Sequence, residues 1–119
     1  MNNLTTDVLK SALDGLMSRQ RAIADNIANI QTPGFLARRV DFESKLQQAV
    51  SDGDTGEARA AGNVTVSRSL EGTREDGNNV NLDDETVLAY QTNLRYQTTV
   101  QAMNAKFQML RTAMGKGGV

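Results

Sequence analysis

The chain has 119 residues, with 13 basic and 14 acidic side chains, and it contains neither cysteine nor histidine. Its length suits one modest domain, and its balanced charge gives no electrostatic reason to expect nucleic acid as a partner. The missing residue types exclude disulfides, zinc sites of the Cys/His kind and Ser–His or Cys–His catalytic pairs. No apolar run is long enough to cross a bilayer, and the first residues lack the layout of a cleaved signal peptide. We therefore expect no catalytic site, no cofactor, no metal and no direct membrane insertion.

An amphipathic helix is predicted from Leu4 to Ile30. Its apolar residues alternate four and three positions apart, as in a coiled-coil seam, and Gln20 fills the one gap. Thr5 or Thr6 is the predicted cap at its start. The seam consists of Leu9, Leu13, Leu16, Ile23, Ile27 and Ile30.

The motif Thr32-Pro33-Gly34-Phe35 is predicted to end this helix. A residue that precedes a proline disfavours the α region, so the helix stops near Thr32. The proline presets the first central residue of a type II turn, and Gly34 accepts the positive φ of the second. Taken as pure structure, the motif is a helix stop followed by a turn. A short second helix is expected from about Asp41 to Val50.

The segment from Ser51 to about Leu82 is polar and rich in turn-forming residues. Within it, residues 64–67 alternate like a half-buried strand. Residues 52–63 resemble a calcium-binding EF-hand loop only superficially, because Gly56 stands where a ligand is needed and Asn63 replaces the final glutamate. No calcium site is therefore expected.

Helix signals return at Asp83, the predicted N-cap of a C-terminal helix. Leu82 and Val87 are placed for a hydrophobic staple across its first turn, and Gly115 is the predicted stop. The apolar stripe of this helix consists of Val87, Tyr90 and Leu94, followed by Tyr96, Val100, Met103, Phe107, Leu110 and Met114.

The length of this last helix decides the predicted shape. Residues 83–114 would extend about 48 Å as one helix, more than the diameter of about 35 Å expected for a compact domain of this size. We therefore predict a mainly α, elongated fold: an antiparallel, coiled-coil-like pair of long N- and C-terminal helices with a small irregular or β insert. The predicted parts are residues 1–50, 51–82 and 83–119, with the two terminal helices forming one core domain.

Some apolar residues lie off the two seams and need further neighbours. Met17 and Ala24 in the first helix and Leu88 in the last are examples. Either the insert folds back over them within a monomer, or other subunits cover them. The periodicity favours neither alternative.

Three stretches resemble a known family. The sequence ANIQTPGF, residues 28–35, resembles the Ala-Asn-x-x-Thr-Pro-Gly-aromatic motif near the N-terminus of bacterial flagellar rod and hook proteins. The sequences ARRVDFE (residues 37–43) and DGNNVNLDDE (residues 76–85) are similar to stretches of the proximal rod type within that family. With the terminal heptads, the resemblance covers nearly the whole chain.

The resemblance implies a structural, non-enzymatic subunit of the basal-body rod. Such proteins are exported by the flagellum-specific secretion apparatus without a cleaved signal, and they polymerise helically with copies of themselves and with other rod proteins. The resulting rod crosses the periplasm, transmits torque and surrounds the export channel. At its proximal end the resemblance implies contacts with the adaptor at the membrane ring and with the export gate.

We expect the turn at residues 32–35 to direct the following segment against a neighbouring subunit. Asn26 and Asn29, one helical turn apart, are predicted to hydrogen-bond across that contact, although exposed polar residues near a helix end are the alternative interpretation. The complete set of predicted interface residues is Leu9, Leu13, Leu16, Ile23, Asn26, Ile27, Asn29, Ile30, Thr32, Pro33, Gly34, Phe35, Phe42, Tyr96, Val100, Met103, Phe107, Leu110 and Met114.

Two other classes of protein are alternatives to a rod subunit. An enzyme would have to use carboxylates such as Asp83, Asp84 and Glu85, but acids at a helix start more often complement the helix dipole. A soluble coiled-coil adaptor or secretion chaperone would form a folded oligomer of fixed size. A rod subunit, in contrast, is expected to be a weakly ordered monomer before assembly.

Overall fold

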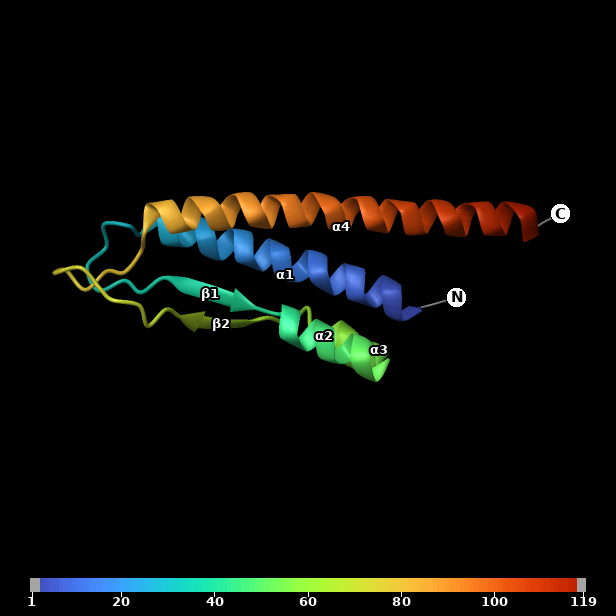
Figure 1. The fold of residues 1–119 in the computed structure, drawn as a ribbon, viewed down its shortest axis with the longest axis horizontal. Coiled ribbons are helices and arrows are strands. Elements are labelled where there is room, and N and C mark those ends of the chain that lie inside the picture. The colour runs from blue at the N-terminus through green and yellow to red at the C-terminus, as the bar shows by residue number, and fades with distance from the viewer. Residues whose placement is uncertain (1–2, 118–119) are drawn as a thin grey trace.

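The computed structural model describes residues 3–117 as an elongated molecule of 69 × 25 × 15 Å (Figure 1). Its radius of gyration is 18.0 Å, whereas a compact chain of this length has about 13.5 Å. The elements in chain order are α1 (Asn3–Ala28), β1 (Arg38–Asp41), α2 (Glu43–Asp52), α3 (Thr55–Ala60), β2 (Thr65–Arg68) and α4 (Leu82–Gly117). The mainly helical, elongated fold predicted from the sequence is confirmed.

The two long helices pack side by side and run antiparallel, as predicted (Figure 1). Helix α4 has 36 residues and α1 has 26, so α4 is longer by about 15 Å. Figure 1 shows that this extra length projects beyond the start of α1. We call residues 103–117 the α4 tail, which includes the projecting turns and the turn before them.

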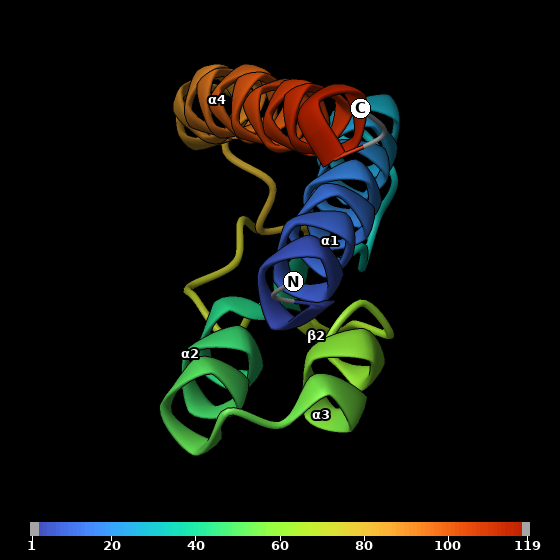
Figure 2. The same ribbon diagram turned by 90° about the vertical axis from the view of Figure 1, so that its right-hand side faces the viewer.

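The insert packs mainly against α1 and touches α4 at only a few side chains. Strands β1 and β2 pair antiparallel, with Val40 opposite Val66, and α2 and α3 lie between them in the chain. Figure 2 shows three layers, with α1 between α4 and the α2–α3 pair. The insert therefore covers one side of α1 and leaves most of α4 uncovered, and Met17 and Ala24 remain exposed in the single chain.

The hydrophobic core lies between α1 and the insert. It is built from Leu16, Ala22, Val40, Phe42, Leu46 and Ala61, with Val8, Ala12, Val64 and Tyr96 at its border. Gly15 allows the Phe42 ring to approach the helix, because a Cβ at that position would lie 2.5 Å from ring atoms. This close packing explains a glycine in the middle of a helix, where it costs about 1 kcal/mol relative to alanine.

The predicted start of the C-terminal helix is wrong by two residues. Asn81 is the N-cap, since its Oδ1 accepts hydrogen bonds from the backbone N–H groups of Asp83 and Asp84 at 2.9 and 3.3 Å. Asparagine caps as well as aspartate does, so the local signals did not distinguish the two positions. The predicted staple also fails, because Leu82 is the first residue of α4 and not the residue before its cap.

Other helix ends differ from the prediction in the same way. Thr5 and Thr6 lie inside α1 and do not cap it, because the helix already begins at Asn3. Gly115 lies inside α4 and has no positive φ, since one exposed glycine weakens a helix without ending it.

The insert holds more regular structure than the sequence indicated. The strand predicted at residues 64–67 is found at Thr65–Arg68 as β2, but its four residues are exposed and not half-buried. The short helix predicted from residue 41 is α2, which begins at Glu43. Strand β1 was missed, because it exists only through its pairing with β2. Helix α3 was also missed; Asp54 caps it by accepting hydrogen bonds from Gly56 and Glu57.

Candidate assembly interface

The turn at residues 32–35 has the features predicted for type II. Gly34 has φ +74°, and the N–H of Phe35 donates to the carbonyl of Thr32 at 3.2 Å. No atom lies within 4 Å of the place that a Cβ on Gly34 would occupy. The glycine is therefore required by its backbone conformation and not by crowding.

The loop of residues 74–80 holds this turn in place. Gly34 donates its N–H to the carbonyl of Asp76 at 2.8 Å. The buried side-chain amide of Asn78 donates to the carbonyls of Asn29 and Thr32 at 2.8 and 2.9 Å. We call residues 29–35 and 74–80 together the loop joint. Two of the three motifs that carried the resemblance thus bind each other within one chain.

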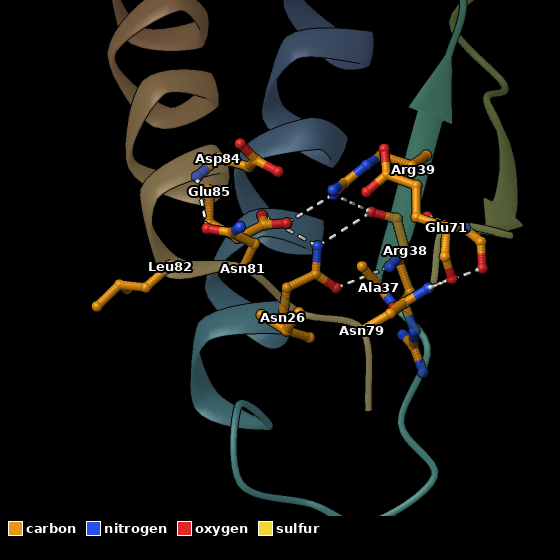
Figure 3. Close-up of polar contacts among 12 residues, drawn as sticks. Asn26, Ala37, Arg38, Arg39, Glu71, Asn79, Asn81, Leu82, Asp84 and Glu85 are labelled. Carbon is orange, nitrogen blue, oxygen red and sulfur yellow. Dashed lines mark hydrogen bonds and ion pairs between the residues drawn. The ribbon is translucent and has the colours of Figure 1, made fainter. Parts of the chain in front are cut away.

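Asn26 connects α1 to the start of β1 (Figure 3). Its side chain is fully buried, its Nδ2 donates to the carbonyl of Arg38 at 3.0 Å, and its Oδ1 accepts from the N–H of Arg38 at 2.8 Å. This pair of bonds imitates the pattern of a neighbouring strand. The predicted role of Asn26 across a subunit contact is therefore replaced by a role inside the chain.

Glu85 of α4 completes this cluster from the other side (Figure 3). Its carboxylate is fully buried, accepts from Arg39 Nη1 at 2.7 Å, and accepts from Asn26 Nδ2 at 3.1 Å. A buried charge is tolerated only when it is paired and hydrogen-bonded, and both conditions hold here. Asn26, Arg38, Arg39 and Glu85, which we call the polar lock, join α1, β1 and α4.

The polar lock also separates the acids that an enzyme would have to use. Glu85 points inward and is paired with Arg39, whereas Asp83 and Asp84 are exposed at the helix start. The three carboxylates therefore do not converge on one site. Among residues 3–117, no cluster of three His, Cys, Asp or Glu side chains is arranged for a metal, and no helix has the length and hydropathy of a membrane span.

The predicted interface residues fall into three groups by exposure. Those buried within the chain are Leu16, Ile23, Asn26 and Phe42. Those half-buried are Leu9, Leu13, Asn29, Ile30, Phe35, Tyr96, Val100, Met103 and Leu110. Those exposed are Ile27, Thr32, Pro33, Gly34, Phe107 and Met114.

The buried group makes its contacts inside one chain. Leu16 and Phe42 belong to the core between α1 and the insert, and Asn26 belongs to the polar lock. Asn29 likewise bonds locally, because its Oδ1 accepts from the Thr32 hydroxyl at 3.0 Å. These side chains are not free to bind a second subunit in this conformation.

Helix α4 presents apolar residues that nothing in the described chain covers. Val87, Tyr90 and Leu94 are 55%, 75% and 65% exposed, and Phe107 and Met114 of the α4 tail are 48% and 72% exposed. Val87, Tyr90 and Leu94 repeat at helical spacing on one side of α4. Tyr96, the first residue of the predicted seam, borders the core instead. The stripe that looked continuous in the sequence is divided between an inner and an outer face.

An apolar groove runs between α2 and α4, with α1 as its floor. It encloses about 660 Å³, and its apolar lining consists of Ala12, Leu16, Phe42, Leu46 and Leu94. Glu43 and Arg95 stand at its edge and form an ion pair with an N–O distance of 3.1 Å. Burial alone would raise the pKa of Glu43, but its hydrogen bond with Arg19 and the charge of that guanidinium hold the pKa below its usual value.

Charge is distributed unevenly over the molecule. Residues 41–60, which we call the acidic arm, contain five acids and two bases, whereas residues 86–117 contain four bases and no acid. At the tip of the arm, desolvation raises the pKa of Glu57, and the nearby carboxylates of Asp52 and Asp54 raise it further. No ion pair among the described residues joins these three acids to a cation.

Several residues of the joint and the lock were missed from the sequence. Arg39 and Glu85 are 46 positions apart, and no local pattern connects a helix-start acid to a distant arginine. Arg74 is another example, since its guanidinium donates to the carbonyls of Ile30 and Val80. The one usable signal was the pair of motifs in the resemblance, because motifs far apart in a chain are often spatial neighbours.

Similarity to known proteins agrees with this architecture. A family model described as "Flagella basal body rod protein" matches residues 7–35. The flagellar basal body rod protein FlgB of Bacillus subtilis (strain 168) is 31% identical, with 95% of each chain covered. FlgB of Borrelia hermsii is 32% identical over 87% of this chain and 91% of its own, and FlgB of Escherichia coli (strain K12) is 27% identical over 91% of each.

The matches to these relatives extend from α1 through the insert to α4, well beyond the segment matched by the family model. They do not favour the adaptor or chaperone alternative. The chain therefore belongs to the FlgB family of flagellar basal body rod proteins, as a structural subunit and not an enzyme.

Proposed function

We propose that this chain occupies the proximal end of the rod and assembles there through the uncovered apolar surfaces of α4. The observation that carries this proposal is the exposure of Phe107 and Met114 on a helix that projects past the start of α1. Large apolar residues gathered on one exposed surface typically mark an interaction site. Contacts with copies of itself and with other rod proteins would bury them.

The same proposal includes two further partners of the proximal rod, the adaptor and the export gate. The resemblance supports contacts with the adaptor at the membrane-ring junction and with the export gate, and export by the flagellar secretion apparatus without a cleaved signal. The acidic arm and the loop joint lie away from the α4 tail, so they offer separate surfaces for different neighbours (Figure 1).

Incorporation into basal bodies tests the proposal. Leu110→Asp places a carboxylate within the apolar stripe of the α4 tail, and we expect basal bodies without the chain and a loss of motility. Gln108→Asp is the matched control, because it adds the same charge about 200° around the same helix. Normal rods with Leu110→Asp as the only copy would contradict an assembly role for this stripe. Equal loss in both variants would point to added charge and not to the stripe.

A further inference from the structure

The α4 tail carries an apolar stripe with a positive charge on each side. Met103, Phe107, Leu110 and Met114 repeat at intervals of four, three and four residues, which places them on one face of the helix. At about 100° per residue, Lys106 lies to one side of this stripe and Arg111 to the other. No ion pair in the described part of the chain occupies either cation.

The groove between α2 and α4 has complementary properties. Its lining is largely apolar, and α2, which forms one wall, leads from Glu43 at the groove edge to the acidic tip at Asp52 and Glu57. The ten residues of α2 extend about 15 Å. The projecting part of α4 also extends about 15 Å, so its length matches that of the groove wall formed by α2.

These two surfaces cannot meet within one molecule. The α4 tail continues the same straight helix whose earlier residues Leu94 and Arg95 form the other wall of the groove, and it points away from α2 and α3 (Figure 1). A basic apolar helix end and an apolar groove walled on one side by the acidic arm thus lie on one chain, and no segment of residues 3–117 fills the groove. Two copies of the chain supply both.

We propose that the α4 tail of one copy docks in the groove between α2 and α4 of a second copy, with its apolar stripe on the groove floor and Lys106 or Arg111 against the acidic arm. This inference rests on the proposed function as a rod subunit and names the surfaces of one contact between copies. The contact joins two different surfaces, so it repeats from copy to copy and yields an open assembly when the rotation does not close.

Charge exchange between the two surfaces tests this contact. The tail variant carries Lys106→Glu and Arg111→Glu, and the arm variant carries Asp52→Lys and Glu57→Lys. Sedimentation velocity of the full chain over a concentration series measures self-association, and circular dichroism checks that each variant keeps its helix content. Each variant alone places like charges together, and we expect its self-association to weaken at least about tenfold.

The equimolar mixture of the two variants is the decisive sample. In the mixture, the charge-reversed tail of one variant can bind the charge-reversed arm of the other, and the remaining native tail can bind the remaining native arm. Association should therefore return to the level of the native chain. Added salt should weaken the association in the native chain and in the mixture alike.

Two further pairs of substitutions distinguish an effect at the proposed contact from an effect of the net charge of the chain. Lys106→Gln with Arg111→Gln lowers the net charge by two, and Gln108→Glu with Thr112→Glu lowers it by the same amount on the opposite face of the tail. Only the first pair should weaken association. Equal effects of the two pairs would show that overall charge is responsible and would overturn the proposed site.

Different results would overturn the contact between copies and the rod function. A native chain that stays monomeric at every concentration, or a mixture that does not recover, would overturn docking between copies and leave the groove to a different rod protein. If basal bodies still contain the chain in that case, the rod function stands without this contact. If basal bodies form normally without the chain, the rod function itself fails, whatever self-association shows.

Discussion

The two ends of this molecule differ in how far one chain completes them. At the end that holds the loop joint and the polar lock, buried polar groups pair with one another, and none among the described residues lacks a partner. At the other end, the α4 tail projects into solvent with Phe107 and Met114 largely uncovered. The first end is completed within one chain, whereas the second leaves apolar side chains for the neighbouring subunit that we propose.

This difference separates residues that maintain the fold from residues that build an assembly. The motif at residues 28–35 belongs to the first class, because it holds the loop joint within one chain. Under the proposed function, the α4 tail belongs to the second class. Substitutions at the two ends should therefore divide between loss of stability and loss of assembly.

The largest effect on stability is expected from Glu85→Ala. Removal of the carboxylate leaves the buried Asn26 amide and the half-buried Arg39 guanidinium without this partner, which costs about 1.5–3 kcal/mol. Urea unfolding followed by circular dichroism measures the loss. Asp84→Ala, at the exposed neighbouring position, is the control and should stay within about 0.5 kcal/mol. A loss below about 1 kcal/mol for Glu85→Ala would show that the polar lock does not stabilise the joint.

The next effect is expected at the turn. Gly34→Val forces a β-branched residue into positive φ at a cost of about 1–3 kcal/mol, although the space around it is open. Pro33→Ala should cost about 1 kcal/mol or less, because it mainly loosens the unfolded chain. Gly72→Val is the matched control, since that position is also open but lacks a positive φ. Equal stability of the two valine variants would mean that Gly34 does not hold a left-handed conformation in solution.

A smaller, pH-dependent effect is expected from Glu43→Gln. The pKa of Glu43 is lowered in the folded state, so its ion pairs stabilise the protein above the unfolded value of 4.5 and are lost as the pH falls through the folded value. At pH 7 the variant should lose about 1 kcal/mol or less, because the carboxylate is partly exposed. The difference between the two proteins should vanish in acid. Glu75→Gln, at an exposed loop position, is the control for the change of charge. A stability difference for Glu43→Gln that stays the same at every pH would contradict the assignment.

The smallest effect on stability is expected in the α4 tail. Met114→Gln should change the free energy of unfolding by no more than about 0.5 kcal/mol, because the side chain is 72% exposed. The same variant should nevertheless reduce incorporation into basal bodies, whereas Thr112→Gln on the opposite face should not. A large loss of stability would place Met114 inside the fold and remove the contrast between the two ends.

Periodicity alone determined the architecture. Two seams of alternating four and three residues, in helices too long for a compact domain of this size, require an elongated antiparallel pair. The turn at Gly34 followed from its local chemistry, since a type II turn needs positive φ at its second central residue. Local signals sufficed because neighbouring residues in the chain make these structures.

Only the tertiary structure decided which face of each helix meets which partner. Leu16 and Phe42 appeared as interface candidates, yet they form the core between α1 and the insert. Tyr96 and Tyr90 appeared to follow one stripe, yet one borders the core and the other lies 75% exposed. Periodicity shows that a face is apolar, but the insert decides what covers it. Its strand β1, its packing on α1 and the pairing of Arg39 with Glu85 all depend on residues distant in the chain.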